Sequence, residues 1–153
     1  MLIGLHDAEK DHMKNKSFPN YALMKLSAYH KAQGDEVIWW KPLDRNLYDM
    51  VYSSKVFDFT PENPYLPENT ARGGTGYGVA EDLSKGIFSN LADAVDAMPP
   101  DYTIYPDCDY AIGYLTRGCI RRVDGAASIP KRGISSPTET CLMSCVPTQT
   151  NLY

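Results

Sequence analysis

The sequence has few cysteines and no long apolar run, and each shortage excludes a class of protein. Four cysteines in 153 residues are far fewer than a disulfide-stapled secreted domain carries. In a reducing compartment they would be thiols, metal ligands or catalytic groups. The apolar run at residues 1–5 is too short for a signal-peptide core or a membrane span. We therefore expect a cytoplasmic protein without a membrane partner.

An excess of basic residues is also missing. The chain has 15 basic and 19 acidic side chains, a formal net charge of -4 and a pI near 5.3. A surface that binds nucleic acid by displacing counterions needs many basic groups, so we expect no nucleic-acid partner. The length allows one complete domain, or one domain and a piece of another.

Strand patterns alternate with a helix pattern in the first half of the chain. Residues 2–5 and 48–53 predict strands, and residues 36–40 predict a buried strand closed by Pro42. A strand, a helix and a strand of this size imply a right-handed parallel crossover. The sequence thus predicts an α/β fold, with a flavodoxin-like or Rossmann-like parallel sheet and flanking helices. Ligands of such sheets sit beyond the carboxyl ends of the strands. Those ends carry His6, Asp7, Lys41, Pro42, Ser53, Ser54 and Lys55.

The helix between the first two predicted strands has start and stop signals. It begins at Pro19, whose fixed φ suits a first turn, and runs to about Gln33, before Gly34 as a left-handed cap. Apolar residues recur at steps of three and four, which predicts one core face, while Lys25 and Lys31 are expected in solvent. The apolar positions are Ala22, Leu23, Leu26, Tyr29 and Ala32.

A glycine-rich segment follows a surface loop predicted at residues 58–70. Residues 73–78 contain four glycines, which would let backbone amides approach a ligand closely, as in phosphate-binding loops. The spacing matches neither the dinucleotide fingerprint nor the P-loop. Two interpretations stay open, a tight turn at a strand end and a cofactor-binding loop. In the second interpretation the binding residues are Gly73, Gly74 and Gly76.

The second half of the chain carries weaker patterns. Residues 80–98 predict an amphipathic helix that ends before Pro99, residues 102–105 favour a short strand, and residues 109–116 predict a central strand. From residue 123 onward neither periodicity persists, and Ser, Thr, Pro and Gly are frequent. Composition alone predicts a poorly ordered tail there.

Four separated segments, taken together, resemble one protein family. They are residues 17–34, 51–60, 73–77 and 114–119, and the last of them reads Tyr-Leu-Thr-Arg-Gly-Cys. They occur in the family's order, and the match extends over residues 1–122. The chain resembles radical SAM proteins in which a cobalamin-binding-type, flavodoxin-like domain precedes a radical SAM barrel.

The resemblance implies a division of the chain into four parts. Residues 1–78 would form the cobalamin-binding-like α/β domain, and residues 79–108 a linker with a helix. Residues 109–122 would be the start of the radical SAM domain, and residues 123–153 an out-of-frame or disordered tail.

The resemblance also implies a metal site that this sequence does not complete. The strand ending at Thr116 would be the first barrel strand, and Cys119 would be the first ligand of a 4Fe-4S cluster that binds and cleaves S-adenosylmethionine. Family members hold the cluster with a Cys-x-x-x-Cys-x-x-Cys loop. The second and third ligand positions here are Val123 and Ala126, which cannot bind iron. We therefore expect no stable cluster in this chain.

A shift of reading frame would explain the break. If the frame moves one nucleotide upstream, the codons of residues 123–126 can read Cys-Arg-Trp-Cys, which restores both missing ligands. The same shift can turn residues 138–145 into Gly-Asp-Met-Ser-Asp-Val-Val, a phrase similar to one that follows the cluster loop in the family. We hypothesise that residues 123–153 are translated out of frame, through a sequencing error or a real lesion.

The other cysteines and histidines have simpler interpretations. Cys141 and Cys145 could share a helix face in a metal site, but a lone pair is weak evidence, and the frame shift would make both accidental. Cys108 is interpreted as a plain thiol, and His30 as a surface or boundary residue of its helix. The chain has no Asp-x-His-x-x-Gly, so we do not expect cobalamin bound with a histidine as lower axial ligand.

Two classes of function follow from these observations. In the first, the chain is the amino-terminal domain and first barrel strand of a radical SAM enzyme that acts on an unknown small molecule. It would be inactive because two cluster ligands and the other barrel strands are missing. In the second, the α/β domain is a stand-alone module that binds a small molecule or serves as an adaptor. A truncated barrel would leave the strand at residues 109–116 unpaired and prone to self-association.

Overall fold

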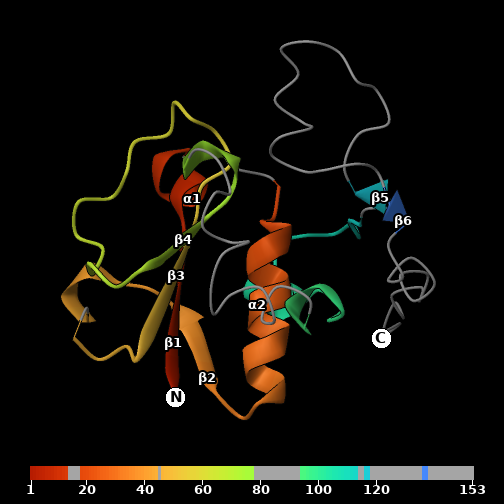
Figure 1. The fold of residues 1–153 in the computed structure, drawn as a ribbon, viewed down its shortest axis with the longest axis horizontal. Helices are drawn as coiled ribbons and strands as arrows, with labels where there is room; N and C mark the ends of the chain where they lie inside the picture. Colours follow the sequence, from red (N-terminus) through yellow and green to blue (C-terminus); the bar gives the residue numbers. More distant parts are fainter. Residues whose placement is uncertain (14–17, 45, 78–93, 114–115, 118–135, 138–153) are drawn as a thin grey trace, which may run out of the picture. The chain divides into compact units, whose positions relative to one another are not determined.

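The computed structural model (Figure 1) describes residues 1–13, 18–44, 46–77, 94–113, 116–117 and 136–137. The chain divides into two compact units, residues 1–109 and residues 110–153, and each is described by itself. Within the described residues, no helix is both long enough and apolar enough to cross a membrane. The helix predicted at residues 80–98 lies mostly outside the described residues.

The first unit is built on a sheet of four strands. β1 (Leu2–Asp7) lies between β2 (Glu36–Trp39) and β3 (Met50–Ser54), and β4 (Ala71–Gly73) pairs with the other side of β3. All three pairings are parallel. The predicted α/β class, with a parallel sheet and the three strands of the first half, is therefore confirmed.

Two strands differ from the prediction. β2 is an edge strand and not a buried one, because its residues alternate between exposed and half-buried. Its apolar run gave no sign of this, since strand order depends on pairing between segments distant in sequence. β4 was not predicted as a strand, because three residues are too few to show a period of two.

Two helices connect β1 to β2, α1 (Ala8–His12) and α2 (Tyr21–Ala32). Asn20 is the cap of α2, because its side-chain oxygen accepts a hydrogen bond from an amide of the first turn at 3.3 Å. Pro19 therefore precedes the cap and does not occupy the predicted first helical position. Gly34 follows the helix in the predicted left-handed conformation, with a φ of +82°.

Apolar residues cover both faces of the sheet. On one face, α2 packs against the central strands, and the buried residues there are Ile3, Leu5, Leu23 and Tyr52. Val51 points to the opposite face, because side chains alternate along a strand, and Leu66 of a loop packs there with Val51 and Trp40. Tyr48 lies over Gly4 on this face, since a Cβ at Gly4 would be 2.9 Å from its ring. A loop and an aromatic ring thus cover the face opposite α2.

Two polar residues of α2 lie inside the protein, contrary to prediction. Lys25, expected in solvent, is 4% exposed, and its Nζ donates to the backbone carbonyl of Asp96 at 2.5 Å. His30, expected at the surface or boundary, is 8% exposed and lies 2.8 Å from Asp35 Oδ2 and 3.1 Å from the Tyr52 hydroxyl. Lys25 is buried because the chain after residue 94 returns to pack on α2, whereas His30 is buried between Asp35 and Tyr52 of β3.

Of the two strands predicted after residue 100, the one at residues 102–105 is not found, and the one at residues 109–116 is described only in part. Residues 102–105 contain the 3-10 helix η3 (Tyr102–Ile104), because the Asp101 side chain accepts from the amide of Thr103 and begins a helical turn. Residues 109–113 form no strand. In the second unit, two-residue strands pair antiparallel, β5 (Thr116–Arg117) with β6 (Ser136–Pro137).

Candidate functional site

Polar side chains meet at the carboxyl end of the sheet. The parallel register places His6 opposite Ser53 and Asp7 opposite Ser54. Figure 1 shows α1 at this same end of the sheet. The sequence predicted that strand-end residues gather here, and the structure confirms this for these four. Lys41, at the end of the edge strand, is exposed instead.

A chain of hydrogen bonds joins four elements at this end. His6 Nε2 lies 2.9 Å from Asp11 Oδ2, and His6 Nδ1 lies 2.7 Å from Ser53 Oγ. Ser53 Oγ lies 2.6 Å from the hydroxyl of Tyr77, in the 3-10 helix η2 (Thr75–Tyr77). Trp40 packs edge-on against the His6 ring, with the ring centroids 5.5 Å apart. The imidazole is therefore held on both nitrogens and on its ring.

The protonation state of Asp11 determines which atoms donate and which accept along this series of hydrogen bonds. The hydrogen bond from His6 outweighs the effect of burial and lowers the pKa of Asp11 from its ordinary value. An ionised Asp11 accepts from Nε2, so a neutral His6 accepts at Nδ1 from the Ser53 hydroxyl. Ser53 then accepts from Tyr77, the pKa of which is raised by burial. The arrangement can hold or move a proton, but Ser53 is only 2% exposed and is not an accessible nucleophile.

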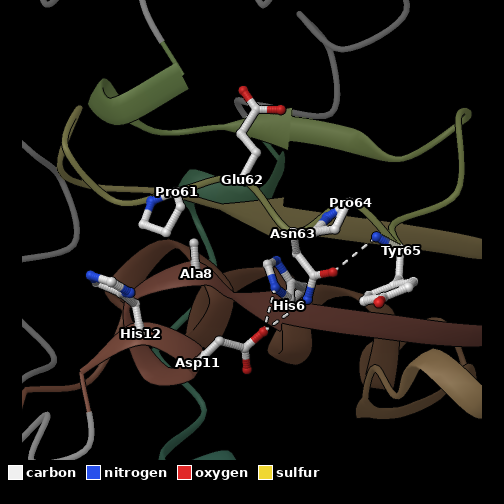
Figure 2. Close-up of a pocket in the computed structure, with 9 residues that line it drawn as sticks. All are labelled: His6, Ala8, Asp11, His12, Pro61, Glu62, Asn63, Pro64 and Tyr65. Carbon is white, nitrogen blue, oxygen red and sulfur yellow. Dashed lines mark hydrogen bonds and ion pairs between the residues drawn. The ribbon is translucent and has the colours of Figure 1, made fainter.

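A hollow of about 210 Å³ lies beside His6 and Asp11. In Figure 2 these two side chains face the loop that carries Asn63, and the Glu62 carboxylate points away from them. Asn63 Nδ2 donates to Asp11 Oδ2 at 3.1 Å, and Asn63 Oδ1 accepts from the Tyr65 amide at 3.0 Å. The other lining residues are Ala8, His12, Pro61 and Pro64. The hollow thus offers a small molecule the Asp11 carboxylate together with polar and apolar lining residues.

The glycine-rich turn packs against the residues that follow β3. Gly74 has a φ of +98°, and a Cβ there would lie 2.2 Å from the Lys55 carbonyl oxygen. A Cβ at Gly76 would lie 2.4 Å from the Phe57 carbonyl oxygen. Both glycines are therefore explained by a tight turn at a strand end. Gly73 has a negative φ, and no atom lies within 4 Å of the position that a Cβ would occupy there, so packing does not explain this glycine.

Glu9 is a site residue that the sequence did not indicate. It is 0% exposed, and its Oε1 accepts the amides of Val56 and Phe57 at 2.8 and 3.2 Å. Among the described residues, Oε2 has no hydrogen-bond partner. Glu9 therefore holds the turn after β3 against α1. No spacing rule predicts this, because the two segments are 47 residues apart.

Asp7 connects the sheet end to a distant segment. Its Oδ1 caps α1 by accepting the Lys10 amide at 3.3 Å, and its Oδ2 accepts from the Tyr105 hydroxyl at 2.5 Å. Burial and the neighbouring Asp7 both raise the pKa of Tyr105. The contact spans 98 residues of sequence, so only the tertiary structure reveals it.

The predicted metal site falls outside the described residues, which include neither Cys119 nor positions 123 and 126. In the part of the chain that the structure describes, no group of three or more His, Cys, Asp or Glu could hold a metal ion. Cys108 is half-buried. Comparison of the chain with protein-family models, with curated proteins and with solved structures found no match.

Proposed function

We propose that this chain is part of a radical SAM iron-sulfur protein, and that its amino-terminal α/β domain binds a small molecule at the carboxyl end of the sheet. The observation that carries the proposal is a meeting of the segments on which the resemblance rests. Asn20, in the segment 17–34, donates to Ser54 Oγ at 2.8 Å, and Ser53 lies 2.6 Å from Tyr77 of the segment 73–77.

At this end of the sheet the three segments meet through polar groups, which are an amide, two hydroxyls and a phenol. Two of these segments also meet in the core, where Leu23 of the segment 17–34 packs with Tyr52 of the segment 51–60. The meeting point is the end of a parallel sheet where ligands of α/β folds bind. The hollow beside His6 and Asp11 supplies space there for a small molecule.

The donor set of this chain does not fit the cluster of the family. Three thiolates are needed to hold such a cluster. Cys119 would supply one, and the side chains of Val123 and Ala126 have no atom that could bind iron. We propose that the chain as written does not cleave S-adenosylmethionine. Our hypothesis that the frame shifts after residue 122 accounts for both missing thiolates together.

The nucleotide sequence past codon 122 tests the radical SAM origin. We expect a T before the Val123 codon and a shifted frame that encodes cysteine at positions 123 and 126. A different base before that codon would overturn the frame-shift hypothesis and weaken the proposed origin.

Anaerobic reconstitution of the full chain with iron and sulfide tests our proposal that the chain as written holds no cluster. We expect no absorbance of a four-iron cluster, and a cluster lost on Cys119→Ser would contradict this expectation.

A stand-alone binding or adaptor module is the second candidate. It is favoured by one observation, since the hydrogen-bonded chain and the hollow use only residues between His6 and Tyr77. If the frame past codon 122 is genuine, this candidate replaces the first. A small-molecule site at the carboxyl end of the sheet belongs to both candidates.

A further inference from the structure

Lys55 is a buried cation at the carboxyl end of β3. Only 6% of its surface is exposed. Its side chain passes beneath the glycine-rich turn, because a Cβ at Gly76 would lie 2.8 Å from Lys55 Cγ. The ammonium ends 5.0 Å from the centroid of the Tyr77 ring. A glycine at position 76 therefore makes room for this lysine side chain.

The ammonium of Lys55 has no anionic partner in the described part of the chain. Nζ lies over the Tyr77 ring, and no hydrogen bond or ion pair of Nζ is found among these residues. The nearby Glu9 carboxylate accepts the backbone amides of Val56 and Phe57 through Oε1, and among the described residues its Oε2 has no hydrogen-bond partner and no ion pair with Lys55. Two lysines of α2 show the contrast, since Lys25 donates to a carbonyl and Lys31 pairs with Asp101.

Burial of an unpaired ammonium is costly, and a neighbouring ring offsets only part of that cost. An anion bound close to Nζ would pair with the ammonium and offset this cost of burial. The turn supplies further donors, because the amides of Gly74 and Thr75 donate to no other described residue. Backbone amides of a glycine-rich turn beside a lysine are a common setting for oxyanions.

We propose that Lys55 binds the oxyanion group, phosphate or carboxylate, of a small ligand at the carboxyl end of β3. This inference rests on the ligand site proposed above and names the charge of the ligand. The Tyr77 ring holds the ammonium in place, while its hydroxyl joins the ring to Ser53 and His6. The oxyanion side of the ligand lies at Lys55, apart from the residues that line the hollow.

Titration of the full chain with inorganic phosphate and with acetate tests the proposal. Sodium chloride at equal ionic strength is the reference, and calorimetry and the thermal midpoint are the readouts. We expect saturable binding and a raised midpoint with at least one of the two anions, and the stronger of them identifies the class. We expect Lys55→Met to weaken that binding at least tenfold. The matched control is Lys41→Met, which removes an exposed lysine at the end of β2 and should leave binding unchanged.

The ligand-free stability of the same variant gives a second measurement. An unpaired buried cation predicts that Lys55→Met is no less stable than the wild type without anion. Lys55→Gln serves if the methionine variant does not fold. Absence of saturable binding of both anions to the wild type would overturn the proposal, and so would equal binding by the Lys55 variant. Neither result bears on the radical SAM origin, which the nucleotide sequence tests separately.

Discussion

His6 Nδ1 lies 2.7 Å from Ser53 Oγ, across the pairing of β1 with β3. Both side chains are nearly inaccessible, with 3% and 2% of their surfaces exposed. A hydrogen bond between two buried groups is costly to break from one side, because the remaining partner is left desolvated and unpaired. The pairing of β1 with β3 therefore positions His6 and Ser53 in the proposed site.

Replacement of Ser53 with alanine should destabilise the protein. Ser53→Ala leaves both His6 Nδ1 and the Tyr77 hydroxyl without their buried partner. We expect a loss of roughly 1–3 kcal/mol in the free energy of unfolding, measured by urea denaturation. Tyr77→Phe removes only one of the two contacts and should cost less. Equal losses for the two variants would show that the hydrogen bond between His6 and Ser53 contributes nothing.

The glycines of the turn should differ in their tolerance of a methyl group. Gly76→Ala places a Cβ 2.4 Å from the Phe57 carbonyl oxygen, and we expect it to cost about 1–3 kcal/mol. Gly73→Ala meets no atom within 4 Å and should change stability by less than about 0.5 kcal/mol. Thermal unfolding of both variants measures the difference.

Gly73→Ala also separates a ligand role from a structural role. If a ligand approaches the backbone at residue 73, the variant loses ligand affinity while its thermal midpoint stays that of the wild type. An affinity that is unchanged for a bound oxyanion would remove Gly73 from the proposed site.

Glu9 should be one of the most sensitive polar residues of the first unit. Glu9→Ala removes the acceptor of the Val56 and Phe57 amides, and we expect a loss of about 3 kcal/mol. Glu9→Gln keeps an acceptor oxygen at that position and should cost less. The exposed Glu36→Ala is a control for loss of negative charge. A loss from Glu9→Ala no larger than from this control would show that the two hydrogen bonds do not stabilise the turn.

Stability should fall in acid partly through Asp101. Burial alone would raise the pKa of Asp101, but hydrogen bonds from Lys31, Ser27 and Thr103 outweigh burial and lower it to about 2. Because the folded pKa is depressed below the ordinary 3.8, the stabilisation is complete above about pH 4 and is lost as pH falls toward 2.

The partly exposed Lys31 limits this stabilisation to about 1 kcal/mol, because solvent screens the ion pair. Asp101→Asn should therefore lower stability at pH 6 and narrow the gap between pH 6 and pH 2.5. Urea denaturation at both pH values, with Asp107→Asn as an exposed control, measures the effect. An acid-induced loss as large in Asp101→Asn as in the wild type would contradict this assignment.

Local patterns predicted part of the site. The strands of the first half end in His6, Asp7, Ser53 and Ser54, and a parallel sheet brings such ends together. The contributions of Glu9 and Tyr77 could not be predicted in this way. Each reaches its partner from another segment, and the contacts depend on how loops fold over the end of the sheet.

The amino-acid sequence alone predicts the parallel α/β architecture of the first unit. Apolar periodicity and the Gly34 cap mark its strands and its helix locally, and the order strand, helix, strand implies a parallel crossover. Tertiary structure decides what is buried. Lys25, His30 and Lys55 have polar side chains that local patterns place in solvent or leave undecided, yet all three are enclosed by segments that return from elsewhere in the chain. Burial depends on contacts between distant segments, and so does the unpaired charge from which we infer an oxyanion site.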